Sequence, residues 1–229
     1  MDGFVQNFLN PAILQQVWPY LLTGLGQTLL LAVLVIPAGA VVGLAIAAAQ
    51  IATRGPVRVI LSIWIDFWRA FPPLVLLIYL FFGLPLLGYD IGMHAAIAIT
   101  FILNTSSYFA EIFRAGIESV PRGQWEASRA TGMSWRQSFL VIVMPQSVRI
   151  VMPDLLSNVI TVTQLTSLAS VVGMNELLHT AQLSQATTYN VTPIIAAALL
   201  YLIVLWPLVR LVSFLDGRRH GTALGEAHR

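Results

Sequence analysis

The sequence predicts an all-α, polytopic membrane protein with five transmembrane helices and one long polar loop. Composition is the first reason, because 57% of the 229 residues are hydrophobic, only 10% are charged, and mean hydropathy is +0.80. A soluble domain usually carries about 25% charged residues, so the expected solvent of this chain is the lipid bilayer. The second reason is that apolar stretches long enough to cross a bilayer recur along the chain. The third is that the arginines, apart from Arg69, lie in alternate loops or at the ends of the spans beside them.

The basic residues exclude several classes of chemistry. All twelve are arginine, and the sequence has neither lysine nor cysteine. A phosphate-binding loop of the G-x-x-x-x-G-K-[ST] type requires its lysine, and thiol nucleophiles and thiolate metal sites require cysteine. We therefore expect no catalytic residues, no metal site and no cofactor in this chain. A net charge of +2 does not indicate a nucleic-acid partner.

The first two predicted spans differ in regularity. Residues 20–50 hold no charge and exceed the about 20 residues needed to cross the hydrocarbon. A G-x-x-x-G pattern starting at Gly39 permits close approach of another helix, although small residues are common in any membrane helix. The second span, residues 60–84, contains Pro72 and Pro73, which break the helical hydrogen bonding near mid-membrane.

The remaining spans are expected at residues 91–113, 145–172 and 193–215. The fourth is the least lipid-like, because it contains Arg149, Asp154 and a run of Thr, Gln and Ser residues. Polar groups exposed to lipid are costly, so this helix is expected to face protein or a water-filled cavity.

Arginine positions predict the orientation. Residues 1–19, 85–90 and 173–192 contain no arginine, whereas the other connections and the carboxy-terminal segment do. By the positive-inside rule, the amino terminus is outside and the carboxy terminus is in the cytoplasm. The first segment lacks the basic region of a cleaved signal peptide, so we expect it to be retained outside the cytoplasm. We expect residues 216–229 to form a cytoplasmic tail that is disordered from Gly217.

The polar loop at residues 116–144 contains an ordered motif. Glu126-Ala127-Ser128 is followed after three residues by Gly132, after nine more by an isoleucine, and then by a methionine-proline pair. The pattern closely resembles the EAA motif of ABC importer permeases, E-A-A-x(3)-G-x(9)-I-x-L-P. Serine replaces the second alanine here, and methionine replaces leucine.

Four further blocks, at residues 66–74, 104–116, 120–124 and 145–149, resemble the polar amino acid branch of the same family. The resemblance implies a type I ABC importer permease fold, with residues 20–215 as the permease domain, in the bacterial cytoplasmic (inner) membrane. It implies a subunit of an ATP-driven amino acid importer that forms the translocation pathway as a dimer with a second permease copy or a paralogue. It also implies two cytoplasmic ABC ATPase subunits, which hold ATP and Mg, and an extracytoplasmic amino acid-binding protein.

The physics of the loop agrees with a docking role. Two short helices hinged at Gly132 would present Glu126 on an exposed ridge, where small neighbours allow close contact and a carboxylate can meet a basic partner. The alternative is an amphipathic helix lying on the membrane and anchored by Trp125 and Trp135. The resemblance implies that the ATPase contacts are Arg122, Gly123, Glu126, Ala127, Ser128 and Gly132.

Charged and polar residues within the spans are candidates for the transport pathway. Arg69 lies in an apolar span, where an unpaired charge is costly, and Asp66 lies three residues earlier on the same helical face, so a local ion pair is the alternative. Asn104, Tyr108 and Glu111 share one stripe of the third span. With Arg69, Glu111 offers the two charges that an amino acid's ammonium and carboxylate require.

Two alternatives restrict this pathway. Arg114 lies three residues after Glu111 and could neutralise it. In the fourth span, where the family often shows K-D-T-S-L, this chain has Q-L-T-S-L, so both charged positions are neutral and Gln164 and Ser167 are the remaining candidates.

Two other classes of protein compete with an ATP-driven permease. A secondary transporter would predict inverted repeats, which five unequal spans do not show. A membrane anchor that binds haem or quinone would need histidine in mid-span, whereas His94 and His179 lie near the ends of outer loops.

Overall fold

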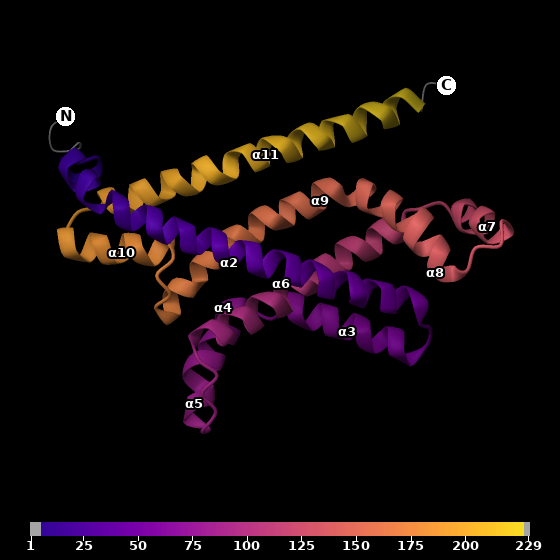
Figure 1. Cartoon of the computed structure of the whole chain (residues 1–229), viewed down its shortest axis with the longest axis horizontal. Coiled ribbons are helices and arrows are strands. Elements are labelled where there is room, and N and C mark those ends of the chain that lie inside the picture. Colours follow the sequence, from indigo (N-terminus) through magenta and orange to yellow (C-terminus); the bar gives the residue numbers. More distant parts are fainter. Residues whose placement is uncertain (1–5, 227–229) are drawn as a thin grey trace. The chain divides into compact units, whose positions relative to one another are not determined.

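The computed structural model describes the backbone of residues 6–226 and the side chains of residues 6–215. Within this part the chain is built of helices and connecting turns, without a strand (Figure 1). Four helices are long and apolar enough to cross a membrane, and a bent pair provides a fifth candidate. The prediction of an all-α polytopic protein is confirmed.

The long helices coincide with four predicted spans, and three of them extend beyond the predicted carboxy-terminal ends. They are α2 (Pro11–Ala52), α6 (Met93–Glu118), α9 (Met144–Leu165) and α11 (Thr192–Glu226). Because α11 continues to Glu226, the disorder expected from Gly217 is wrong for the described part of the tail. Residues 227–229 lie outside the described residues.

The second predicted span is broken at the proline pair. α3 (Pro56–Ala70) is followed by α4 (Pro73–Ile78), and the helical path bends by 87° between them. Pro72 has an extended backbone, and Pro73 occupies the start of α4, where the missing N–H leaves no helical hydrogen bond unmade. The path continues through the π-helical η1 (Tyr79–Gly83) and the short α5 (Leu84–Leu86).

The chain forms two compact units. Unit 1 comprises Pro72–Ile102, Ile160–Val209 and the described part of Met1–Pro37. One of its apolar clusters surrounds the fully buried Leu77 and Phe101, and the other contains residues of α2, α10 and α11. Unit 2 comprises Ala38–Phe71, Leu103–Val159 and the described part of Arg210–Arg229.

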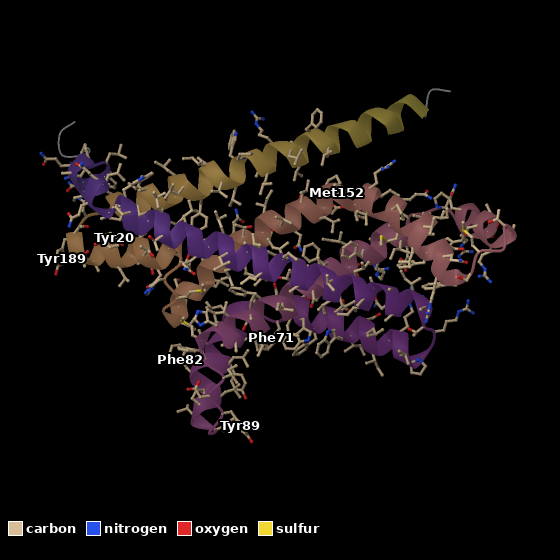
Figure 2. All side chains as sticks on the ribbon, viewed as in Figure 1. Tyr20, Phe71, Phe82, Tyr89, Met152 and Tyr189 are labelled. Carbon is tan, nitrogen blue, oxygen red and sulfur yellow. The ribbon has the colours of Figure 1, made fainter. Side chains whose placement is uncertain are left out.

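Unit 1 contains a helix that was not expected. α10 (Leu177–Thr188) lies within residues 173–192, which the sequence placed in an outer loop. It runs beside the N-terminal half of α2 (Figure 1), and the contact is close at Gly24. A Cβ at Gly24 would lie 2.7 Å from Thr180 Oγ1 and 3.0 Å from Leu177 Cα, so this approach requires glycine. Figure 2 shows Tyr20 and Tyr189 at this end of the unit.

α10 begins at a buried carboxylate. Glu176 is 0% exposed, and its two carboxylate oxygens accept hydrogen bonds from the backbone N–H groups of His179 at 2.7 Å and Leu178 at 2.9 Å. The Tyr201 hydroxyl of α11 donates to Glu176 Oε2 at 3.1 Å. Burial raises the pKa of Glu176 even though these donors oppose the shift. The residue caps α10 and joins it to α11.

In unit 2, α2 and α6 approach closely. A Cβ at Gly39 would lie 2.6 Å from Thr105 Cγ2, and a Cβ at Gly43 would lie 2.7 Å from the Ser106 carbonyl oxygen. Only glycine leaves room for these backbone contacts. The close approach expected from the G-x-x-x-G pattern is confirmed.

Candidate functional site

The polar loop carries a short exposed helix, α7 (Arg122–Ala130), which ends in a tight turn. Gly132 has a φ of +83°, and its N–H donates to the Arg129 carbonyl at 3.0 Å. The Met133 N–H donates to the Ser128 carbonyl at 3.3 Å. These two bonds define a Schellman turn. The residue in the left-handed conformation of such a turn is usually glycine. The predicted hinge at Gly132 is confirmed.

The next helix is held against the first by aromatic stacking. Ser134 and Gln137 form a reciprocal capping box at the start of α8 (Trp135–Gln137), which continues through the π-helical η2 (Ser138–Val143) into α9. The Trp135 ring stacks on Trp125 of α7, with centroids 5.9 Å apart, and on Phe139 at 5.3 Å. The two tryptophans therefore hold α7 against α8, and Trp135 is still 38% exposed.

The loop is also fixed to its neighbours by an apolar cluster. Ile117 and Val120 at the end of α6 pack with Phe139 and Val143 of η2, and Trp125 packs against this cluster. A displacement of α7 would therefore be transmitted to both helices by packed side chains. Figure 1 shows α7 and α8 beyond the ends of α6 and α9.

The outer face of α7 exposes most of the predicted docking residues. Arg122, Gly123, Glu126 and Ala127 are exposed, and within the described residues the Glu126 carboxylate has no hydrogen bond or ion pair. Ser128 is the exception. Its side chain is 6% exposed, and its hydroxyl donates to the Trp125 carbonyl at 2.9 Å. The expectation that Ser128 lies on the exposed ridge is wrong, because that position faces the interior of the loop.

A chain of ion pairs joins the end of α6 to the start of α3. Arg114 binds Glu111 through Nε at 3.0 Å and Nη2 at 2.5 Å, and its Nη1 binds Glu118 at 2.5 Å. The other carboxylate oxygen of Glu118 accepts from Arg58 Nη2 at 3.1 Å. Sequence reasoning missed Glu118, although its i,i+4 spacing from Arg114 favours a pair. The alternative for Glu111, a pair with Arg114, is confirmed.

The candidates in α3 and the middle of α6 form a different contact from the one expected. The Arg69 guanidinium lies over the Tyr108 ring, 5.4 Å from its centroid, which is a cation–π geometry. Asn104 Nδ2 donates to the Trp68 carbonyl at 3.2 Å. Within the described residues, no ion pair joins Asp66 to Arg69, so the alternative of a local pair is wrong. Arg69 therefore contacts the Tyr108 ring and not the Asp66 carboxylate.

Gln164 and Ser167 lie near the end of α9 and in the 3-10 helix η3 (Thr166–Val172), both within unit 1. The Ser167 hydroxyl donates to the Gln164 carbonyl at 2.8 Å, while the Gln164 side chain is exposed. Sequence reasoning also missed Glu176 as a structural residue of this unit. Its signal was the glycine at position 173 followed by an acidic N-cap before a polar stretch.

Comparison with known proteins agrees with this architecture. Residues 39–221 match the family described as binding-protein-dependent transport system inner membrane component. The chain is 36% identical over 197 residues to the probable amino-acid ABC transporter permease protein YckA of Bacillus subtilis (strain 168), covering 86% of this chain and 87% of that protein. It is 32% identical over 211 residues to the probable glutamine ABC transporter permease protein GlnM of the same organism, covering 92% and 98%.

A solved structure extends the comparison to three dimensions. A chain in the crystal structure of an amino acid ABC transporter with histidines superposes with a TM-score of 0.80 at 30% identity. The match covers 90% of this chain and 96% of that one. The chain therefore belongs to the family of inner membrane components of binding-protein-dependent transport systems.

Proposed function

We propose that this chain is the permease subunit of an ATP-driven importer for amino acids. Its relatives are named as permease proteins of amino-acid and glutamine ABC transporters, and the similar solved structure is an amino acid ABC transporter. Within the chain, one observation carries the proposal. α7 presents an unpartnered carboxylate, Glu126, on a helix whose exposed neighbours are small and whose position is fixed by packing.

The proposed complex contains a second copy of this chain or a paralogue, two cytoplasmic ABC ATPase subunits and an extracytoplasmic amino acid-binding protein. ATP and Mg bind to the ATPases, so this chain supplies no catalytic residue and no cofactor. The amino terminus lies outside and the carboxy terminus in the cytoplasm, since arginines occur in alternate connections. This orientation places α7 on the cytoplasmic side, where an ATPase can reach it.

Coupling would pass through the rigid loop. Closure of the ATPase pair moves α7, because the Glu126 carboxylate is held by a basic group of the partner. Trp125 and the apolar cluster around Val120 carry this movement to α6 and η2. The spans then alternate between outward and inward access as their populations shift with the ATP state.

The proposed substrate pathway includes Asp66, Arg69, Asn104, Tyr108, Glu111, Gln164 and Ser167. The contact that supports it most is that of Arg69 with Tyr108, because an exposed guanidinium held by an aromatic face remains available for a substrate carboxylate. Arg69→Ala should abolish substrate-stimulated uptake while basal ATP hydrolysis by the complex persists. The double variant of Arg69→Ala with Asp66→Asn tests the alternative of an ion pair between these residues. Since no ion pair joins the two residues, adding Asp66→Asn should not restore uptake, and a rescue would contradict the pathway role.

The coupling role is tested by charge reversal on α7. Glu126→Lys should abolish ATP-dependent uptake and ATPase co-purification while the chain stays in the membrane, because repulsion replaces the charge-assisted contact. Arg136→Glu, an exposed charge reversal on α8, is the matched control and should retain both. Normal uptake by Glu126→Lys would show that this carboxylate has no part in coupling.

Uptake and co-purification measured on the same membranes distinguish the competing functions. A secondary transporter would lose uptake when the ion gradient is collapsed and would retain it without ATP. A membrane anchor would show neither response and would not co-purify with an ATPase.

A further inference from the structure

The broken end of α3 leaves two backbone carbonyls without their helical donors. In an α-helix the N–H of each residue donates to the carbonyl four residues earlier, and positions 72 and 73 are both proline, which has no N–H. The carbonyls of Trp68 and Arg69 therefore cannot receive the bonds that a continuing helix would supply. An unpaired carbonyl is costly away from water, so neighbouring helices usually satisfy such groups in membrane proteins.

Asn104 of α6 supplies one of the missing donors. Its side-chain Nδ2 donates to the Trp68 carbonyl oxygen at 3.2 Å, and both residues belong to unit 2. A carbonyl can only accept, so the amide nitrogen and not the amide oxygen has to face it. Asn104 is also only 8% exposed. Its amide therefore serves the backbone of α3 and is poorly placed to reach a solute in an open pathway.

The next turn of α6 holds the following residue of α3. Tyr108 lies four residues after Asn104 and so on the same helical face, and its ring contacts the Arg69 guanidinium. Two positions of α6 thus hold consecutive residues of α3, Trp68 through its carbonyl and Arg69 through its side chain. Arg69 and Tyr108 are exposed, unlike Asn104. The buried bond fixes the backbone from which the exposed guanidinium extends.

We propose that Asn104 is a positioning residue and not a substrate ligand. It replaces the N–H that Pro72 lacks, fastens the broken end of α3 to α6, and so sets where the Arg69 guanidinium meets a substrate carboxylate. This inference rests on the pathway role proposed above for Arg69. A guanidinium binds a carboxylate best in a defined, planar orientation. A loose backbone at this point therefore weakens binding, because the orientation has to be ordered when the substrate arrives.

The first measurement follows the backbone of α3 and needs no transport. A nitroxide is attached at Ala70→Cys, an exposed position at the end of α3 in a chain without native cysteine. Its mobility is recorded by electron paramagnetic resonance in the assembled complex. Asn104→Leu has a side chain of similar size without the donor and should increase the mobility. Thr105→Val is the matched control and should leave the spectrum unchanged, because the buried Thr105 hydroxyl has no hydrogen-bond partner among the described residues.

The second measurement follows uptake by complexes without the label. It uses radiolabelled glutamine or, if the wild type does not import it, whichever amino acid the wild type imports from a mixture of the standard ones. Asn104→Leu should raise the apparent KM about tenfold, the loss expected for one hydrogen bond, while the maximal rate and basal ATP hydrolysis stay unchanged. Tyr108→Leu should also raise the KM but leave the nitroxide spectrum unchanged, because the ring holds only the Arg69 side chain. Thr105→Val should change neither quantity.

Several results would overturn the proposal. Unchanged mobility in Asn104→Leu would refute the fastening, and a raised KM beside it would make Asn104 a direct substrate ligand. Increased mobility with an unchanged KM would make the bond a structural contact that does not present Arg69. Equal changes in Thr105→Val would assign both effects to packing.

Two further outcomes are distinguished by the same measurements. If Asn104→Leu does not assemble, Asn104→Ala, which cannot overpack the site, provides the same comparison. If Arg69→Ala leaves uptake intact, the pathway role of Arg69 fails, and with it the presenting role of Asn104. The nitroxide comparison then still decides whether Asn104 fastens the end of α3.

Discussion

α7 and α10 are both short helices between membrane spans, and each has one glutamate, within α7 and at the N-cap of α10. The two glutamates differ in burial and in hydrogen bonding. Glu176 at the start of α10 is fully buried and accepts hydrogen bonds from two backbone N–H groups and the Tyr201 hydroxyl. Glu126 in the middle of α7 is exposed and has no partner in the part of the chain that the structure describes.

The difference indicates that Glu176 stabilises the fold, whereas Glu126 is available to bind a partner. A buried carboxylate whose acceptors are all engaged stabilises the position of its helix and has no capacity left for a partner. An exposed carboxylate on a helix that packs firmly on its opposite face is free to bind another protein without local rearrangement. α10 is therefore expected to govern the stability of unit 1, and α7 the interaction of unit 2 with the ATPase.

Truncating both glutamates tests most directly whether they differ in their contribution to stability. Glu176→Ala should lower the free energy of unfolding by about 2–4 kcal/mol, because it removes the N-cap and leaves buried donors unpaired. Glu126→Ala should change it by less than about 0.5 kcal/mol, as for other exposed sites. Thermal unfolding of the purified chains provides both values. Comparable losses in the two variants would refute the distinction.

Packing around the two helices should differ in the same direction. Gly24→Ala should destabilise by about 1–3 kcal/mol, because its Cβ would meet the backbone of Leu177 and Glu176 at 3.0–3.1 Å. Gly123→Ala in α7 is the matched control, since no atom lies within 4 Å of its Cβ. It should be neutral or slightly stabilising, because alanine favours helix. A stability loss in Gly123→Ala would mean that the face of α7 is more tightly packed than described.

A smaller effect should appear in the pH dependence. Burial raises the pKa of Glu176 above its ordinary value of 4.5, so the folded chain binds this proton more tightly than the unfolded chain. The resulting stabilisation is fully present below pH 4.5 and is lost as the pH rises through the raised folded-state pKa. Over that window the Tm of the wild type should fall relative to Glu176→Gln, which cannot titrate. Parallel pH profiles would contradict the shift.

Local signals accounted for the features that the sequence predicted well. The Gly132 turn and the break at Pro72 each depend on the backbone properties of one or two residues. The burial of Glu176 depends on Tyr201, 25 residues away, and on the packing of α10 against α2. No periodicity within residues 173–192 reveals such contacts, so α10 was expected to be a loop.

The candidate sites were predicted only in part. Motif spacing predicted the exposed position of Glu126 in α7, but it could not show that Ser128 turns inward to its own helix. Likewise, the spacing of Asp66 and Arg69 permits an ion pair, whereas the fold supplies Tyr108 from another helix. A contact with another helix decided the outcome for Arg69, whereas the Ser128 hydroxyl bonds to a carbonyl of its own helix.

The most direct test of the coupling claim is site-specific cross-linking from adjacent positions on α7. Ala127→Cys places a thiol on the exposed face, and Ser128→Cys places one on the buried face, in a chain that has no native cysteine. With a short maleimide photo-cross-linker on membranes that contain the assembled complex, we expect an ATPase adduct from position 127 and little or none from position 128. Equal adducts from both positions, or none from position 127 when labelling is complete, would contradict it.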